Sequence, residues 1–325
     1  MKRVMDYIWP LVGLVAVVLS VRALYHKLYA EAAADPAVRA ALEAGGFWSD
    51  VRAIAGAIGG RLADLPLSAY LLAGASTLVA YLALAWYDRI ALVHLRKEKG
   101  ISWAYVAVCS FTTYALSHNI GASVFSGGMV RFRAYTAKGL SAAEVAVLVA
   151  VCSFTFAFGT ILLLGLVLVW EPQILAPLAS LSHWFAIGET PARLIGFGLL
   201  AFCAVYTVGS WLHLPPLHIG KFELVYPRLP IVARQYVAAP LELIGAAGII
   251  HFALPEAGHP GFMIVLGAFL LSFSAGLLSQ VPGGVGVMEA VFLAILPGVP
   301  ATAVFAALLV WRLFYLLLPL ALSIP

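Results

Sequence analysis

Long apolar runs, separated by short polar loops, cover most of this chain. A helix needs about 20 mainly apolar residues to cross a hydrocarbon core of about 30 Å. Each run of that length with few charges is therefore predicted to be a full transmembrane helix. Six runs qualify, at residues 8–24, 67–86, 143–169, 194–212, 231–252 and 301–322. The pattern predicts an all-α integral membrane protein with about six spans.

Two further apolar stretches, residues 101–135 and 262–296, are each broken near the middle by a glycine-rich segment. A helix that faces lipid does not tolerate such a break, because the bilayer core offers no water to satisfy the freed backbone groups. We therefore predict that each stretch is a re-entrant hairpin, which enters the membrane and returns to the side from which it came.

The two broken stretches also share a sequence pattern. Ser110-Phe111, Leu116-Ser117 and Gly121 recur at a constant offset of 162 residues as Ser272-Phe273, Leu278-Ser279 and Gly283. Their predicted orientations in the membrane are opposite, so we predict an inverted repeat. Inverted repeats whose broken helices meet at the membrane midplane are a transporter architecture. The N-termini of the half-helices there favour an anionic group, such as a lipid phosphate.

The distribution of Lys and Arg predicts which helix ends face the cytoplasm, because short cytoplasmic loops are enriched in these residues. Basic residues lie before the first run and gather at residues 89–99, 131–138 and 221–228. With six full spans and two re-entrant hairpins, this distribution places both the N-terminus and the C-terminus in the cytoplasm.

Composition excludes several classes of protein. Of the 325 residues, 63% are apolar and 10% are charged, whereas a soluble domain has about 45–50% apolar and about 25% charged residues. A water-soluble enzyme and a nucleic-acid-binding protein are therefore excluded, and the net charge of +4 is too small to indicate a polyanion partner. The three cysteines, Cys109, Cys152 and Cys203, lie in apolar runs without paired spacing and are expected to be buried and unbridged.

We predict a single polytopic membrane domain over residues 1–325. Residues 1–66 would hold the first span and a long outer loop, and residues 67–325 the transport core with the repeat. Part of the outer loop is amphipathic, and this segment either lies flat on the outer membrane surface or packs over the outer helix ends. Its apolar face contains Val51, Ile54, Ala55, Ile58 and Leu62.

The glycine-rich segments and the ionisable groups near them are the candidate lipid-binding site. Glycines let a ligand approach the main chain closely, although they also serve close helix packing, and charges at membrane depth are functional candidates. The predicted binding residues are His118, Asn119, Gly121, Gly127, Gly128, Arg131, Arg133, Gln280, Pro282, Gly283, Gly284, Gly286, Glu289, Arg312 and Glu242. No catalytic residue, metal ligand or cofactor is predicted, because the sequence contains no metal-binding or nucleotide-binding motif.

Three of these residues lie in or beside the second half of the repeat. Glu289 begins an apolar half-helix, where it either holds part of a head group or balances the helix dipole. Arg312 lies deep in the last span and is expected to pair with Glu289, with Glu242 or with a lipid phosphate. Glu242 follows a proline within its span and is expected to bind a ligand, to pair with Arg234 or to serve packing.

The first half of the repeat offers its own alternatives. Arg131 and Arg133 either bind head-group phosphates at the cytoplasmic mouth or anchor the loop by the positive-inside rule. His118 and Asn119 either hydrogen-bond a head group or are satisfied inside the protein. The segment 141–144 is a capping box that begins the next helix, so its glutamate is predicted to be structural.

At these two loops the chain resembles a known family, the lysylphosphatidylglycerol synthase transmembrane region. This region is the flippase part of the bifunctional multiple peptide resistance factor. The resemblance rests on residues 117–133 and 138–141 and on the segment Pro282-Gly283-Gly284-Val285-Gly286-Val287-Met288-Glu289-Ala290, and it covers residues 67–325. It implies a bacterial inner-membrane protein that moves aminoacylated phosphatidylglycerol between leaflets. It also implies that the loop residues His118, Asn119, Gly121, Gly127, Gly128, Arg131, Pro282, Gly283, Gly284, Gly286 and Glu289 bind the lipid.

We therefore expect a flippase-like lipid translocase for an anionic or aminoacylated phospholipid such as lysyl-phosphatidylglycerol. The aminoacyl-transfer domain of the bifunctional members is absent from this sequence, so no enzymatic activity is expected. The expected partners are the phospholipid substrate, a separate lipid-modifying synthase and a second copy in a homodimer, with no nucleic acid. Two alternatives stay open: a membrane enzyme acting on a phospholipid or polyprenyl-phosphate, with His118 or Glu289 as general base, and an ion-coupled small-molecule transporter.

Overall fold

The structure is a computed structural model of the 325-residue chain. It describes residues 46–120, 123–181, 187–215, 217–219, 222–224, 226–279 and 281–324, together with residues 22, 25, 28 and 29. The predicted first span, residues 8–24, lies outside these residues except for Arg22, and so do the predicted site residues Gly121 and Gln280.

Six described segments are long and apolar enough to cross a membrane, which confirms the prediction of a helical membrane protein. They are α4 (Leu67–Leu95), α7 (Ala142–Trp170), α8 (Glu189–Trp211), α9 (Leu229–Ala253), α10 (Phe262–Ser279) and the last span (Ala301–Leu322). Five of them match predicted spans. The sixth, α10, is the first half of a stretch that was predicted to be a re-entrant hairpin, yet its 18 residues would reach about 27 Å at 1.5 Å per residue.

Both apolar stretches with glycine-rich centres consist of two helices. The first forms α5 (Trp103–Ile120) and α6 (Ser123–Thr136), and the second forms α10 and α11 (Val287–Ile295), joined through the 3₁₀ turn η3 (Pro282–Gly284). The side of the membrane to which each stretch returns, and the inverted repeat, stay predictions.

The remaining elements are short or lie near the ends of the spans. The last span consists of α12 (Ala301–Trp311), a π-helical segment η4 (Arg312–Leu317) and α13 (Leu318–Leu322). The 3₁₀ segment η1 (Pro172–Ser180) follows α7. Among the described residues only β1 (Leu217–Ile219) and β2 (Phe222–Leu224) are strands, paired antiparallel with Leu217 opposite Leu224.

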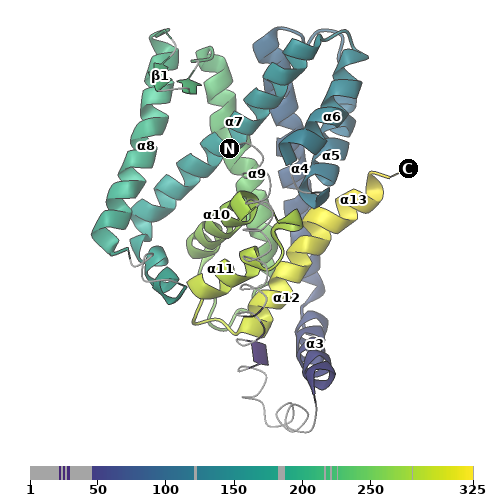
Figure 1. Ribbon diagram of the computed structural model, residues 1–325, viewed down its shortest axis with the longest axis vertical. Helices are drawn as coiled ribbons and strands as arrows, with labels where there is room; N and C mark the ends of the chain where they lie inside the picture. The colour runs from purple at the N-terminus through teal and green to yellow at the C-terminus, as the bar shows by residue number, and fades with distance from the viewer. Residues whose placement is uncertain are drawn as a thin grey trace, which may run out of the picture. The chain divides into compact units, whose positions relative to one another are not determined.

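The chain divides into two compact units. Unit 1 contains Met1–Thr77, Gln173–Gly188 and Ala246–Leu318, and unit 2 contains Leu78–Pro172, Glu189–Gly245 and Pro319–Pro325. In unit 2, α5 packs against α6, α6 against α7, and α7 against α8 (Figure 1). The core where α7, α8 and α9 meet is aromatic, with Phe158, Cys203, Tyr206 and Val232 buried together.

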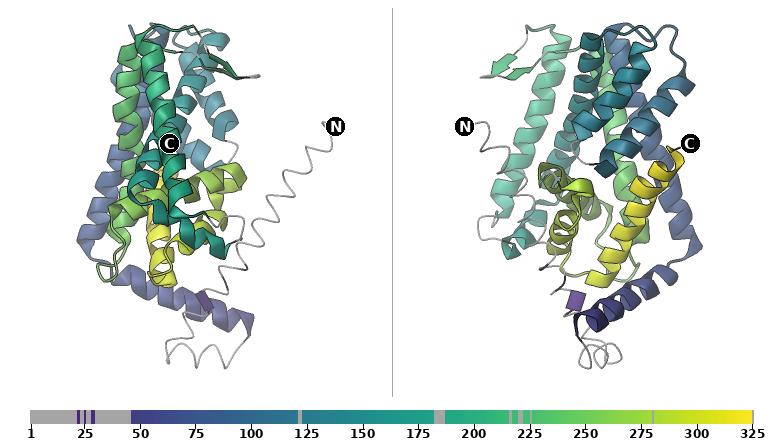
Figure 2. Two further views of the ribbon diagram at one scale, coloured as in Figure 1. Left: turned by 90° about the vertical axis from the view of Figure 1, so that its left-hand side faces the viewer. Right: turned by 45° about the vertical axis from the view of Figure 1, so that its right-hand side comes forward.

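In unit 1, α10 packs against α11, and α11 packs against α12. The helix α3 (Phe47–Ala63) lies against α12 (Figure 2), and it buries Ile54 and Ile58, each 7% exposed. Both isoleucines belong to the predicted apolar face of the outer loop. Their burial favours the alternative in which this segment packs over helix ends.

Two smaller predictions are confirmed. Ser141 begins α7 through a capping box, in which the Glu144 N–H donates to Ser141 Oγ (3.2 Å) and the Ser141 N–H donates to Glu144 Oε2 (2.8 Å). Lys97 Nζ lies 3.0 Å from the same carboxylate. The three cysteines are buried and unbridged.

Candidate functional site

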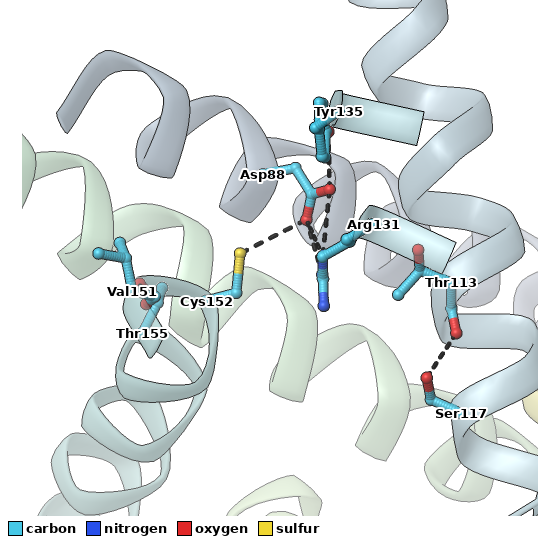
Figure 3. Close-up of polar contacts among 8 residues, drawn as sticks. All are labelled: Asp88, Thr113, Ser117, Arg131, Tyr135, Val151, Cys152 and Thr155. Atoms are coloured by element: carbon cyan, nitrogen blue, oxygen red, sulfur yellow. Dashed lines mark hydrogen bonds and ion pairs between the residues drawn. The ribbon is translucent and has the colours of Figure 1, made fainter. Parts of the chain in front are cut away.

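A buried ion pair joins α4 to α6 in unit 2. Arg131 donates from Nη2 to Asp88 Oδ1 (2.7 Å) and from Nε to Oδ1 and Oδ2 (3.1 and 3.3 Å), which is the forked geometry that suits a carboxylate. Figure 3 shows the two side chains facing each other between the helices. Asp88 is 0% exposed and Arg131 is 5% exposed.

Further polar groups hold this ion pair in place. The Tyr135 hydroxyl donates to Asp88 Oδ2 (2.8 Å), and the Cys152 thiol lies 3.4 Å from Asp88 Oδ1 (Figure 3). The Tyr114 ring lies against the guanidinium, with Arg131 Cζ 4.8 Å from the ring centroid. Buried charges are tolerated only when they are paired and hydrogen-bonded. Every one of these contacts therefore lowers the cost of keeping two charges inside the unit.

Sequence reasoning missed Asp88 because the predicted span ended at residue 86, which placed this aspartate in a loop. In the structure α4 continues to Leu95, so Asp88 lies inside the helix. The signal that could have placed Asp88 inside the helix is that apolar residues continue in the sequence soon after it. Arg131 was predicted at the cytoplasmic mouth, either on a phosphate or as an anchor, but the structure buries it against Asp88. Arg133, two residues later, is exposed.

Gly127 and Gly128 differ in their surroundings although they are neighbours. A Cβ atom on Gly127 would collide with Ser117 Oγ and lie 3.1 Å from Thr113 Cγ2, whereas a Cβ on Gly128 would meet nothing within 4 Å. Gly127 therefore allows α6 to approach α5 closely, as the packing alternative for this residue proposed.

His118 and Asn119 lie in the last turn of α5. Asn119 Nδ2 donates to the Ala115 carbonyl oxygen (2.8 Å), and the His118 ring centroid is 5.6 Å from that of Tyr114. The Asn119 amide thus makes a hydrogen bond within its own helix. The His118 ring lies beside Tyr114, whose ring lies against the Arg131 guanidinium.

A second ion pair lies in unit 1, between α11 and the start of η4. Arg312 donates to Glu289 Oε1 from Nη2 (2.5 Å) and from Nε (2.9 Å). Its remaining group, Nη1, donates to the Gly283 carbonyl oxygen (2.8 Å), and the Gly286 N–H donates to Glu289 Oε2 (2.7 Å). Of the partners predicted for Arg312, Glu289 is the one that the structure places on it.

This second pair closes on the glycine-rich loop itself. Gly283, Gly284 and Gly286 have φ values of 62°, 61° and 83°, in the left-handed region that favours glycine. Pro282 begins the turn η3 within this loop. The guanidinium and the carboxylate therefore bond to two backbone groups within the break, at Gly283 and Gly286. The π-helical segment that begins at Arg312 is of a kind common at functional sites.

Glu242 on α9 belongs to unit 2 and is 1% exposed. The Tyr87 hydroxyl lies 3.5 Å from Glu242 Oε2. Arg234 donates from Nη1 to the Pro230 carbonyl oxygen (3.2 Å), so the alternative that paired it with Glu242 is wrong. Two residues eight positions apart on one helix are about 12 Å apart along its axis, which explains this outcome.

Metal-binding groups do not gather within the described part of the chain. No group of three or more His, Cys, Asp or Glu side chains is arranged there to hold a metal ion. The described residues contain instead two guanidinium–carboxylate pairs, Asp88–Arg131 in unit 2 and Glu289–Arg312 in unit 1. Each pair lies beside one of the two glycine-rich interruptions that the sequence predicts.

Comparison with known proteins finds two relatives of similar length. Uncharacterized protein slr0712 of Synechocystis is 31% identical over 254 residues, which cover 77% of this chain and 76% of that protein. Inner membrane protein YbhN of Escherichia coli is 30% identical over 254 residues, which cover 76% of this chain and 75% of that protein. No protein-family model matches the chain.

Proposed function

The chain belongs to the family of inner membrane protein YbhN, and on this premise we propose that it is a lipid translocase of a bacterial inner membrane. It would move an anionic phospholipid between the two leaflets without changing it chemically. The polar head group would pass through the helical units, while the acyl tails stay in the surrounding bilayer.

The observation that carries this proposal is the Asp88–Arg131 pair. A charged side chain at membrane depth is costly, and such residues commonly mark the path of a polar substrate or ion. Here a guanidinium, the side chain best suited to a phosphate, is buried on α6 against Asp88 of α4, a helix that is long and apolar enough to span a membrane. A soluble solute and a lipid head group would both use such a site. The resemblance of the loops to the lysylphosphatidylglycerol synthase transmembrane region favours the lipid.

The same resemblance supports aminoacylated phosphatidylglycerol as one substrate, supplied by a separate lipid-modifying synthase. In this proposal Arg131 recognises the phosphate. Glu289 and Arg312, predicted as ligands of the head group, instead hold the glycine-rich loop, because Glu289 Oε2 accepts from the Gly286 N–H and Arg312 Nη1 donates to Gly283. Transport would be passive, coupled to an ion or driven by a partner.

The test is lipid movement in proteoliposomes, read with head-group-labelled lipids and a quencher confined to the outside. Phosphatidylglycerol, lysyl-phosphatidylglycerol and phosphatidylcholine are compared in vesicles with wild-type protein, with the double variant Asp88→Asn/Arg131→Gln and with no protein. The double variant removes both charges of the pair together, so that no lone charge stays buried. Arg133→Gln, at an exposed position two residues away, is the matched control.

We expect the wild-type protein and Arg133→Gln to expose the labelled anionic lipids to the quencher, and the double variant to lose that activity. Equal quenching with and without wild-type protein would overturn the proposal. A chemically altered lipid after incubation would instead favour the membrane-enzyme alternative. Proton- or sodium-dependent uptake of a soluble solute would favour the transporter.

A further inference from the structure

His259 lies in the loop that joins the end of α9 to the start of α10, and both nitrogens of its ring are hydrogen-bonded. Nε2 lies 3.1 Å from the carbonyl oxygen of His251, in the last turn of α9. Nδ1 accepts from the N–H of Gly261 (3.0 Å), the residue directly before α10. The Gly261 carbonyl oxygen accepts in turn from the Val265 N–H in the first turn of α10 (3.2 Å). One side chain therefore joins the end of one helix to the beginning of the next.

The bond from Gly261 determines where the proton lies on this ring. A backbone N–H can only donate, so Nδ1 is the acceptor and carries no proton. A neutral imidazole has a single N–H, which then lies on Nε2 and donates to the His251 carbonyl oxygen. Both bonds therefore form together only when His259 is neutral and in this one tautomer. A protonated ring has an N–H on each nitrogen, so its Nδ1–H would face the Gly261 N–H.

The backbone of the loop holds the ring in the position from which it reaches both helices. The His259 N–H donates to the Glu256 carbonyl oxygen (3.2 Å) and closes a four-residue turn. Gly258 is the third residue of this turn and has φ 73°, a left-handed value that glycine adopts without strain. Pro260 follows the histidine and restricts the backbone of His259 to extended conformations. The side chain is therefore placed by a defined turn.

Few groups near this ring are charged or can become charged. The His251 ring packs against that of His259, with centroids 4.5 Å apart. Glu256 is exposed at the other end of the turn. The next charged residue on α9, Glu242, precedes His251 by nine positions, which is about 13 Å along the helix axis. The elements beside the loop, α10 and residues 296–300, contain no acidic, basic or histidine side chain.

These surroundings make protonation of His259 unfavourable for the closed loop. The carbonyl end of α9 attracts a positive charge, but the N–H end of α10 repels it, so the two helix dipoles oppose each other at the ring. The exposed Glu256 carboxylate attracts only weakly, because water screens it. What remains is the change at Nδ1, where protonation replaces a hydrogen bond from Gly261 by a contact between two donors.

We propose that His259 is a pH-sensitive link between α9 and α10, closed when its imidazole is neutral and opened when the imidazole is protonated. Histidine changes its charge between about pH 5 and pH 8, so the link is closed at the upper end of this range and opens as the pH falls. Opening frees the start of α10, the helix that leads into the glycine-rich turn held by Glu289 and Arg312. Because α9 follows the basic segment 221–228, the link is predicted on the outer side of the membrane. This inference does not rest on the proposed function.

The nitrogen NMR spectrum of the full-length protein in detergent, labelled with nitrogen-15 at histidine, tests the protonation state. The chemical shifts of the two ring nitrogens report which of them carries the proton. The signals of His259 are those absent from the variant His259→Asn. We expect a single tautomer with the proton on Nε2 at about pH 8, and protons on both nitrogens at about pH 5. A proton on Nδ1 at about pH 8 would overturn the link, because the Gly261 N–H would have no acceptor there.

Hydrogen exchange resolved by peptide tests whether the loop opens. The protection of residues 254–264, relative to an unstructured peptide at the same pH, is compared at about pH 8 and about pH 5. The test variant His259→Asn does not titrate, and an Asn oxygen in a turn still accepts from the N–H two residues later. The matched control is His213→Asn, the same change at an exposed histidine that follows α8.

We expect protection over residues 254–264 of the wild type to fall about threefold to tenfold on acidification, which corresponds to the loss of one net hydrogen bond. His213→Asn should show the same fall, and His259→Asn should be equally protected at both pH values. An undiminished protection in the wild type, or an equal fall in His259→Asn, would overturn the link. So would an equal fall over α5, because acid would then loosen the whole protein. Neither measurement uses lipid movement, so the link is decided even if the translocase proposal fails.

Discussion

Asp88–Arg131 in unit 2 and Glu289–Arg312 in unit 1 contain the same two chemical groups but bond to different parts of the chain. The first links two helices, and its additional partners are side chains, such as the Tyr135 hydroxyl. The second bonds to two backbone groups within a glycine-rich turn, at Gly283 and Gly286. A buried ion pair in a membrane protein can therefore either fasten a glycine-rich turn or link two helices.

The two ion pairs also differ in the exposed fractions of their side chains. The Arg131 and Asp88 side chains are 6% and 0% exposed, and those of Arg312 and Glu289 are 14% and 4% exposed. Removing one charge should therefore cost more in unit 2 than in unit 1, because the partner left behind is more fully removed from water. The substitutions below test this contrast, from the largest expected effect to the smallest.

Asp88→Asn should produce the largest effect. It leaves the Arg131 charge buried without a counter-charge, and breaking a buried pair in this way costs about 3–5 kcal/mol. We expect that loss in the free energy of unfolding, measured by denaturant titration in detergent micelles. The double variant Asp88→Asn/Arg131→Gln should recover part of it. A double variant as unstable as the sum of the two single variants would argue that the pair is not coupled.

Glu289→Gln should destabilise the protein less, by about 1.5–3 kcal/mol, because it weakens hydrogen bonds to a charged group that is partly exposed. The amide also replaces an oxygen that accepts from the Gly286 N–H. Hydrogen exchange resolved by peptide should speed up over residues 281–289 and stay unchanged over α5 and α6. Equal acceleration in both regions would contradict the view that this pair fastens only its own loop.

Gly127→Ala should cost about 1 kcal/mol, at the lower end for overpacking, because the new methyl group meets Ser117 Oγ and that hydroxyl can rotate away. Adding Ser117→Ala should restore stability. Gly128→Ala is the matched control, since nothing lies within 4 Å of a Cβ at that position, and it should be neutral or slightly stabilising. The measurement is the unfolding temperature of the wild type, of Gly127→Ala, of Gly127→Ala/Ser117→Ala and of Gly128→Ala. Similar losses for Gly127→Ala and Gly128→Ala would mean that close packing of α5 on α6 is not the reason for Gly127.

Arg133→Gln should have the smallest effect, within about 0.5 kcal/mol, as is usual for a substitution at an exposed site. It removes the same charge as a substitution at Arg131, two residues away, but from an exposed position. The comparison is made by the same denaturant titration. A loss as large as that of Asp88→Asn would show that general positive charge on α6, rather than the buried pair, stabilises unit 2.

Sequence reasoning reached some features because they depend on neighbours along the chain. The helix that begins after Ser141 was predicted from residues 141–144 alone, and the same residues form its capping box in the structure. The pairing of Arg312 was expected because a charge so deep in a span needs a partner. Asp88 was missed, since a span predicted to end at residue 86 left it in water and gave no reason to seek a counter-charge.

By itself the sequence determined that this is a helical membrane protein, where most of its described spans run, and that glycines interrupt two apolar stretches. These properties follow from length and hydropathy, which are local along the chain. The tertiary structure alone decided that Asp88, 43 residues before Arg131, is its partner. The physical reason is that pairing and burial depend on which helices pack together, and residues distant in the sequence decide that packing.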